Sequence, residues 1–469
     1  MPDKYHIKPQ PVPPRLARVG RCGVVDWRED CARCHNCVKK ACVYDRYRNE
    51  AEYLRTLQDV NALYFDCMGC FSCVQSCTKN LLRLAVNPVY EALGNAYWTP
   101  EIIRTTWVQA ETAKIPVSGA GYPGPFSGPG FDSMWTDMSE IVRPTRDGIH
   151  GREYISTSVD IGRKPSHLSF KGDDLATADR PLVSLPMPLI LDLASDQHTL
   201  PKLEPSLIET AVRTGLMALI DSALWPVAGV DPQRCLPHVA FYLRPDGPQI
   251  APEVLKKTRL VEVPDSPNVD AVLTSLKKAC PALVTAVRVE LTAAGPQRVL
   301  SLAGHEAVEV IHIVADLNGN EVGREKPRHI KDLIRQVHTG LIETGKRDEV
   351  TVVAGGGIAL PEHMAKAIIC GADLVTVNLP LLIALECHLC RTCRPGMSCP
   401  AQLERIDPAY AVGRMTNLIA AWHDQLIEVM GAMGMREARR LRGDVGRAMF
   451  FEQLEEETFG KLFGTRRVS

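Results

Sequence analysis

The sequence predicts an α/β protein built on a parallel (β/α)8 barrel, with a cysteine-rich module before the barrel and a cysteine cluster and helical tail after it. Three observations lead to this prediction. Short apolar segments alternate with amphipathic helical segments between residues 181 and 386. Two runs of closely spaced cysteines precede that region, and a third run follows it directly. The 469 residues are enough for two or three domains with a sizeable core.

The composition is that of an ordinary globular protein, with 45% hydrophobic and 23% charged residues. A formal net charge of -1 gives no electrostatic reason to expect nucleic acid or an anionic membrane surface as a partner. No stretch reaches about 18 uninterrupted apolar residues, so we expect no direct membrane span. The first residues do not resemble a signal peptide, and we therefore expect a cytoplasmic protein whose thiols stay reduced.

The first two cysteine runs are the strongest signal in the chain. We expect residues 1–21 to form an extended arm and residues 22–90 to form the module that carries these runs, spaced C-x2-C-x2-C-x4-C and C-x2-C-x2-C-x3-C. This spacing matches a bacterial two-cluster ferredoxin, in which the last cysteine of each run serves the other cluster. The predicted ligands are Cys31, Cys34, Cys37 and Cys77 for one [4Fe-4S] cluster, and Cys67, Cys70, Cys73 and Cys42 for the second.

Zinc is the alternative ligand for these cysteines, because C-x2-C pairs also build tetrahedral zinc sites. Each run offers three cysteines in sequence and a distant fourth, which favours a cubane. Two features depart from the ferredoxin pattern: Val43 and Thr78 replace the usual Pro after the fourth cysteine, and a longer insertion separates the runs. Within that insertion, residues 46–55 predict a surface helix.

Residues 91–180 are rich in loops and contain a Gly/Pro run at 119–130, which prevents regular helix or strand. Phe131 and Trp135 follow this run and would be costly to expose. We therefore expect the segment to pack on the barrel, the alternative being a solvated linker.

Eight strand-helix units over residues 181–386 predict the barrel. The expected strands are 182–185, 216–220, 238–243, 260–263, 286–291, 308–314, 350–354 and 374–377. Helical segments are expected at 205–214, 269–279, 328–344 and 361–370. A doubly wound open sheet would give a similar alternation, so periodicity alone leaves both folds open.

The seventh unit ends in Gly355, Gly356 and Gly357, followed by a helix. Glycine amides ahead of a helix N-terminus can approach a phosphate, and barrels place phosphate in the loops after strands 7 and 8. These three glycines are the predicted cofactor-binding residues. A tight turn without a ligand is the alternative.

The third cysteine cluster occupies residues 387–400 and is followed by a helical tail over 401–469, with helices expected at 414–433 and 436–457. Its four cysteines predict a third [4Fe-4S] cluster, and they are Cys387, Cys390, Cys393 and Cys399. A [3Fe-4S] cluster that leaves Cys390 free, or zinc, are the alternatives.

The order of these parts resembles the archaeal-type, FMN-binding glutamate synthase-like family. The motifs that carry the resemblance are Gly355-Gly356-Gly357, Ala365-Lys366-Ala367, Gly371-Ala372-Asp373, Gly431-Ala432-Met433-Gly434 and Leu441-Arg442-Gly443. The resemblance implies an FMN barrel in which a neighbouring iron-sulfur cluster delivers electrons, and the reduced flavin reduces 2-iminoglutarate to L-glutamate. Electrons would come from ferredoxin or a partner flavoprotein, since no G-x-G-x-x-G fingerprint follows a strand.

Several loops that hold flavin or substrate in that family are altered here. The altered segments are 187–191, 221–226, 315–321 and 378–380, and Arg288 stands where the family has Lys. Loss of glycine removes both close approach and backbone donors. Two interpretations follow: an FMN-dependent glutamate synthase-like oxidoreductase, or a flavin-free electron-relay and scaffold subunit of a hetero-oligomeric redox complex. A zinc-dependent interaction protein is a third.

Catalytic residues are sought at the carboxyl ends of barrel strands or inside the barrel. Arg288, Asp316 and Asn318 are the candidates there. Each is also readily explained as an ordinary barrel residue.

Overall fold

The computed structural model describes most of the chain. The described residues are 5–16, 19–26, 32, 34, 36, 41–43, 70–115, 128–136, 154–175, 180–193, 203–244, 250–390 and 399–464. The chain forms two compact units. The barrel unit comprises Met1–Val12, Val108–Leu385 and Gln402–Ser469, and the cysteine unit comprises Pro13–Trp107 and Glu386–Ala401.

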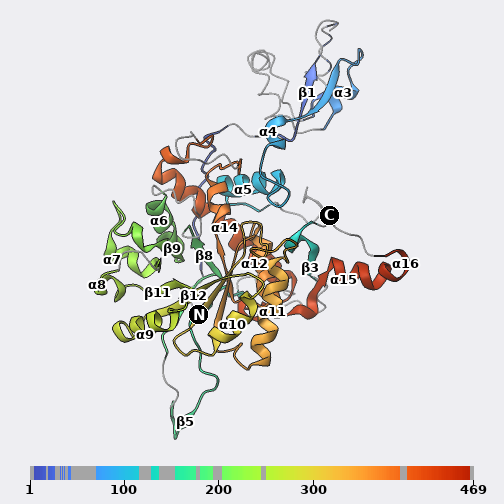
Figure 1. Ribbon diagram of the computed structural model, residues 1–469. Coiled ribbons are helices and arrows are strands. Elements are labelled where there is room, and N and C mark those ends of the chain that lie inside the picture. Colours follow the sequence, from blue (N-terminus) through green and yellow to red (C-terminus); the bar gives the residue numbers. More distant parts are fainter. Residues whose placement is uncertain are drawn as a thin grey trace. The chain divides into compact units, whose positions relative to one another are not determined.

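Eight parallel strands close into a barrel at the centre of the barrel unit (Figure 1). They are β8 (Leu189–Asp192), β9 (Met217–Asp221), β10 (Val239–Tyr242), β11 (Leu260–Pro264), β12 (Val284–Glu290), β13 (Val310–Val314), β14 (Thr351–Gly355) and β15 (Leu374–Val377). The last strand pairs with the first, with Val375 opposite Leu189. The predicted (β/α)8 barrel is confirmed, and an open sheet is excluded.

Helices alternate with these strands and surround them. They are α6 (Glu204–Thr214), α7 (Pro232–Cys235), α8 (Pro252–Leu255), α9 (Val269–Ala279), α10 (Gly295–Ala303), α11 (Ile330–Glu343), α12 (Pro361–Cys370) and α13 (Leu379–Ala384). The short 3-10 helices η6 (Ser222–Leu224) and η7 (Leu236–His238) lie between them. Because helices cover the sheet, most strand residues are buried and the strands read as continuous apolar runs.

The first barrel strand does not lie where the sequence predicted it. Residues 182–185 were expected to form that strand, but β7 (Val183–Leu185) pairs antiparallel with β4 (Val159–Ile161) outside the barrel. The first barrel strand is β8, so residues 189–191 belong to the strand itself and not to an altered loop after it. Two short apolar runs separated by prolines cannot be ranked by pattern alone.

The tail begins with the long helix α14 (Pro408–Ala432), preceded by the 3-10 helix η8 (Leu403–Arg405). The helix predicted at 436–457 is wrong. That segment contains η9 (Ala438–Leu441), η10 (Val445–Arg447) and β16 (Ala448–Phe450), followed by α15 (Phe451–Glu455), the π-helix η11 (Glu456–Gly460) and α16 (Lys461–Phe463). Gly443 has φ +70°, a left-handed conformation that ends a helix.

Strand β16 pairs antiparallel with β3 (Met134–Thr136), which follows the 3-10 helix η4 (Gly130–Ser133). The segment containing Phe131 and Trp135 thus packs within the barrel unit, and Phe131 is fully buried. A further hairpin, of β5 (Phe170–Lys171) and β6 (Asp174–Leu175), precedes β7.

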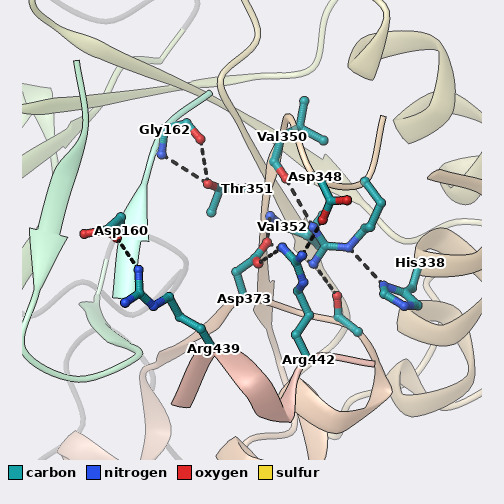
Figure 2. A network of polar contacts seen from close by, with 12 residues as sticks. Asp160, Gly162, His338, Asp348, Val350, Thr351, Val352, Asp373, Arg439 and Arg442 are labelled. Atoms are coloured by element: carbon teal, nitrogen blue, oxygen red, sulfur yellow. Dashed lines mark hydrogen bonds and ion pairs between the residues drawn. The ribbon is translucent and has the colours of Figure 1, made fainter. Parts of the chain in front are cut away.

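At the end of the barrel where the strands begin, a network of buried charges joins the tail to the strands (Figure 2). Asp373 accepts hydrogen bonds from Arg347 at 3.0 Å, from Arg442 at 3.0 Å and from the Val352 amide at 2.7 Å. Arg347 also donates to Nδ1 of His338 at 2.9 Å. We call His338, Arg347, Asp373 and Arg442 the basal network.

In the cysteine unit, β1 (Cys22–Asp26) pairs antiparallel with β2 (Leu82–Val86). Two short helices, α3 (Ser72–Gln75) and α4 (Pro88–Glu91), flank β2, and α5 (Pro100–Thr112) begins in this unit. The surface helix predicted at 46–55 lies outside the described residues. Among the described helices of the whole chain, none is both long and apolar enough to cross a membrane.

Candidate functional site

The barrel interior holds a buried ionic network toward the end where the strands finish, the end at which barrel enzymes place their active sites. Arg288 on β12 lies at its centre and donates to Asp192 of β8 at 3.0 Å. It also pairs with Glu262 of β11, and its guanidinium carbon lies 4.6 Å from the centre of the Tyr242 ring. The three charged side chains are at most 10% exposed.

His312 of β13 extends this network across the barrel. Because a carboxylate only accepts, Nδ1 of His312 donates to Glu262 over 2.9 Å, and Nε2 lies 3.1 Å from the Thr376 hydroxyl of β15. A Cβ on Gly355 would stand 2.5 Å from that hydroxyl and 2.8 Å from Nε2. Gly355 is therefore required for the contact to form. We call Asp192, Glu262, Arg288, His312 and Thr376 the mouth network.

Two members of the mouth network, Glu262 and Arg288, stay charged although they are buried. Burial alone would raise the pKa of Glu262, but the charges of Arg288 and His312 and their hydrogen bonds outweigh it and hold the pKa at about 2. Burial would lower the pKa of Arg288, but Asp192 and Glu262 raise it overall. The positive charge of Arg288 is thus offset by two carboxylates of the chain, which leaves it poorly suited to bind the carboxylate of a substrate.

Of the predicted catalytic residues, Arg288 belongs to the mouth network and the other two lie together in the loop after β13. There Oδ1 of Asp316 accepts from the backbone amides of Asn318 at 2.9 Å and Asn320 at 2.7 Å. These bonds hold the turn, which is an ordinary structural role for Asp. A catalytic role for these residues stays a prediction.

Sequence reasoning missed four members of the mouth network, Asp192, Glu262, His312 and Thr376. A signal for two of them was present. Glu262 and His312 each interrupt a short apolar strand, and a charged or imidazole side chain inside such a strand needs a buried partner.

The predicted phosphate-binding glycines lie in a tight approach between two loops. A Cβ on Gly356, at φ +95°, would be 2.6 Å from the carbonyl oxygen of Asp316, and one on Gly357, at φ +68°, would be 2.5 Å from Cα of Gly319. This close approach explains the glycines without a ligand. At the next strand, the Asn378 side chain accepts from the Leu379 amide at 2.6 Å and so caps α13 itself.

These observations test whether the residues fit FMN. A phosphate site after strands 7 and 8 needs unoccupied backbone amides, and the α13 amide at Leu379 already has a partner in Asn378. A flavin ring over the mouth would meet an arginine already paired with two carboxylates. The Leu379 amide and Arg288 are thus already engaged by partners within the chain, which disfavours FMN at these two positions. Whether Gly355, Gly356 and Gly357 bind a cofactor stays a prediction.

The segment at 130–133 is fastened to the same end of the barrel by an Asp–His pair. Nδ1 of His363 accepts from the Ala359 amide at 3.2 Å, so Nε2 carries the proton and donates to Asp132 at 3.0 Å. Lys366 donates to the Phe131 carbonyl at 2.8 Å, and the Phe131 ring lies 5.0 Å from that of His329. Burial alone would raise the pKa of Asp132, but His363 and Lys366 hold it below its usual value.

In the cysteine unit, backbone amides surround the thiols of the second run. The amide and hydroxyl of Ser72 lower the pKa of Cys70, and the Val43 amide adds to this effect. Burial would raise the pKa of Cys77, but amides led by that of Leu81, 3.3 Å from the sulfur, lower it overall. Amides directed at sulfur stabilise the thiolate, which is the form that binds metal.

Described residues of the two runs lie close together in this unit. Val43 follows Cys42 and reaches Cys70, while Ala41 packs against Cys73 and Cys77 in a small core. The assignment of Cys42 to the cluster of the second run stays a prediction. Cys31, Cys37, Cys67 and Cys393 lie outside the described residues, and the described residues alone contain no group of three metal ligands.

The third cysteine set belongs to the same unit. Cys387 is buried and accepts from the Leu389 amide at 3.5 Å. Glu386, just before it, pairs with Arg15 at 3.2 Å, and the His388 carbonyl accepts from the Gly94 amide at 3.1 Å. Cys390 and Cys399 are partly exposed. The donor set of sulfurs and amides therefore fits iron-sulfur clusters in this unit.

Comparison with known proteins points to one family. Residues 330–436 match the conserved region in glutamate synthase. The archaeal-type glutamate synthase [NADPH] of Dehalococcoides mccartyi is 26% identical over 90% of this chain and 93% of that protein. The archaeal glutamate synthase [NADPH] of Archaeoglobus fulgidus is 24% identical over 90% of this chain and 92% of that protein.

Among solved structures, the flavin-binding domain of baker's yeast flavocytochrome b2 matches 81% of this chain and 88% of that chain at 11% identity, with a TM-score of 0.39. That score is too low to support a statement about ligands. The conserved region, together with relatives that match along nearly the whole length, supports a glutamate synthase-like family for this chain.

Proposed function

We propose that the chain is an iron-sulfur oxidoreductase subunit that carries electrons through three cysteine-held clusters, with its glutamate synthase-like barrel as a flavin-free scaffold. One observation carries this proposal: the described cysteines of all three sets fall into one compact unit and not into the barrel unit. When bound, such clusters accept and release single electrons. The chain's own contribution is to hold the thiolates and direct amides at their sulfurs.

The barrel supports the scaffold role through its mouth network. Arg288 is neutralised by Asp192 and Glu262, and the loops after β13 and β14 are packed backbone to backbone at Gly319 and Gly357. In this proposal, electrons enter from ferredoxin or a partner flavoprotein and leave to another subunit of a redox complex.

A second function is favoured by the family match. If FMN is bound despite the residues described above, the chain would be a glutamate synthase-like enzyme of reductive amination. The match over 90% of the chain to a named glutamate synthase supports this candidate.

Flavin extraction and iron quantification on one anaerobically purified sample separate the two. About twelve irons per chain, as three cubanes give, without flavin are expected. About one FMN per chain would contradict the scaffold proposal and justify assaying 2-oxoglutarate with ammonia. A colourless protein that contains zinc would overturn both.

Single cysteine variants test the cluster ligands. Cys73→Ala should lose about four irons per chain, because Cys73 is assigned to one cubane. Cys235→Ala is the matched control, since Cys235 is a buried cysteine of the barrel unit and should leave the iron content unchanged. Equal iron in both variants would remove Cys73 from the ligand set.

A further inference from the structure

The last helical segment of the chain, residues 451–463, has an unusual surface. None of its described side chains is buried. Phe459, Leu462 and Phe463 are 54%, 75% and 80% exposed, and Glu456 and Glu457 are exposed beside them. We call these five residues the tail patch. Helices this short are marginal in water unless an apolar face is packed, so the segment lacks the contact that would stabilise it.

The segment nevertheless leaves the barrel unit at a fixed place. Phe450 is 5% exposed, and the guanidinium carbon of Arg335 lies 4.1 Å from the centre of its ring. Trp135 packs edge-on against Phe451 with ring centres 5.9 Å apart. The start of the segment is therefore anchored to the barrel unit at Phe450 and Phe451.

The hairpin of β5 and β6 also exposes apolar side chains, but the charged groups near it are mostly positive. Leu168 and Phe170 are 63% and 65% exposed, and a two-stranded hairpin alone is marginally stable. Beside it lies a cavity of about 370 Å³ with more cations than carboxylates in its lining. The cations are Arg163, Lys164, Arg180 and Lys346, and the carboxylates are Glu306 and Glu349.

The cations differ in how they are paired. Arg163 and Lys346 both bond Glu349, at 2.5 Å and 2.9 Å. Arg180 reaches Glu306 only at 3.9 Å, in a pair whose carboxylate is 86% exposed. We define the hairpin patch as Lys164, Leu168, Phe170 and Arg180. It combines exposed apolar side chains with positive charge, next to Asp173 and Asp174 of the hairpin turn, whereas the tail patch combines them with the negative charges of Glu456 and Glu457, next to Lys461, the single cation of residues 451–463.

The two patches do not meet within one chain, because in Figure 1 the β5 hairpin and the α15–α16 segment project from the barrel in different directions. We propose that the tail patch of one copy docks on the hairpin patch of a second copy. Phe459, Leu462 and Phe463 then cover Leu168 and Phe170, while Glu456 and Glu457 face Lys164 and Arg180. Two different surfaces meeting in this way give a head-to-tail, heterologous contact that can extend from copy to copy.

The charge complementarity favours a second copy over an unrelated protein, since both halves of the contact occur on this chain. Patches this small give a weak contact that depends on concentration. Exposed charge pairs are screened by salt, with a Debye length of about 10 Å at 0.1 M and about 3 Å at 1 M. Assembly should therefore weaken as salt rises.

Two variants of the full-length chain test the contact by sedimentation velocity under anaerobic conditions. The tail variant carries Phe459→Asp and Phe463→Asp, and the hairpin variant carries Leu168→Asp and Phe170→Asp. All four positions are exposed, so folding should be unaffected. Val272→Asp on α9, 40% exposed and outside both patches, is the matched control.

The wild-type chain and the control should form dimers and larger species as concentration rises to about 100 μM, and each double variant alone should remain a monomer. An equimolar mixture of the two variants should recover dimers but nothing larger, because each retains one intact patch. Three outcomes would overturn the proposal: a wild-type chain that stays monomeric, a double variant that still assembles, or a mixture that stays monomeric.

Discussion

Each end of the barrel holds a buried arginine in a network that also contains carboxylates and one imidazole, but the two networks connect different parts of the chain. The mouth network joins side chains of five strands to one another, through Arg288, Glu262 and His312. The basal network joins Asp373 to backbone and to the tail, through the Val352 amide and Arg442 (Figure 2).

This difference separates two uses of buried charge. At the base, charges fasten distant segments, which is the stabilising role expected at the end where barrel strands begin. At the mouth, charges occupy the space in which barrel enzymes bind ligands, and they satisfy one another. In the scaffold proposal, the mouth network therefore has the same role as the basal network, which is to stabilise the barrel.

The largest effect is expected from Asp373→Ala in the basal network. This change leaves Arg347 buried with a lost carboxylate partner and leaves the Val352 amide unpaired. Breaking a buried ion pair from one side costs about 3–5 kcal/mol in the free energy of unfolding. Urea denaturation measures this loss directly.

Asp348→Ala is the control for that measurement. Asp348 also pairs with Arg442, at 2.5 Å, but its side chain is 85% exposed, so about 0–1 kcal/mol is expected. Equal losses for the two variants would show that the basal network does not derive its strength from burial.

The next effect is expected from Glu262→Gln in the mouth network. The pKa of Glu262 is lowered from 4.5 to about 2, so its contribution to stability is complete above pH 4.5 and is lost as pH falls toward 2. The depression corresponds to about 3 kcal/mol at neutral pH. The variant should lose roughly that amount at pH 7, and its stability should fall less steeply than that of the wild-type chain below pH 4.5.

Urea midpoints at pH 7, 4.5 and 3.5 would show this difference. If the variant and the wild-type chain lost stability in parallel between pH 4.5 and 3.5, Glu262 would not be charged inside the barrel. A variant that gained flavin would argue instead that the mouth network is what excludes the cofactor.

How well the sequence predicted each region depends on how far apart along the chain the interacting residues lie. Barrel strands and helices follow local patterns, and Val269–Ala279 and Pro361–Cys370 begin and end where the sequence placed helices. The mouth network joins residues 26 to 96 positions apart, such as Arg288 with Glu262 and with Asp192. Local patterns do not contain such pairings, so only Arg288 was identified.

Two errors have the same origin. β7 and β8 are both short apolar runs, and only pairing with β15 makes the second one the barrel strand. The helical pattern predicted over 436–457 was overridden by Gly443 and by pairing of β16 with β3. The cluster assignment drawn from the cysteine spacing stays a prediction, although the described members of the two runs share one unit; they are Cys34, Cys42, Cys70, Cys73 and Cys77.

The smallest effect on stability is expected from His338 of the basal network. It falls in a higher pH range than the effect of Glu262 in the mouth network. Burial, together with the charges of Arg347 and Arg442, lowers the pKa of His338 from 6.5 to about 4. The unfolded chain therefore takes up a proton below pH 6.5 that the folded chain refuses, and stability falls between pH 6.5 and 4. Because the ring is partly exposed, we expect only about 1 kcal/mol.

His338→Asn retains an acceptor for Arg347 and cannot be protonated in this range, so its stability should change less than that of the wild-type chain between pH 7 and 4.5. Glu262→Gln should leave this upper window unchanged, since the Glu262 contribution is lost only below pH 4.5. Urea midpoints at pH 7, 6 and 5 for both variants and the wild-type chain would test the assignment. If the stability of His338→Asn fell with pH as steeply as that of the wild-type chain, another group would cause this pH dependence. The pKa of His338 would then be the same in the folded and unfolded chain.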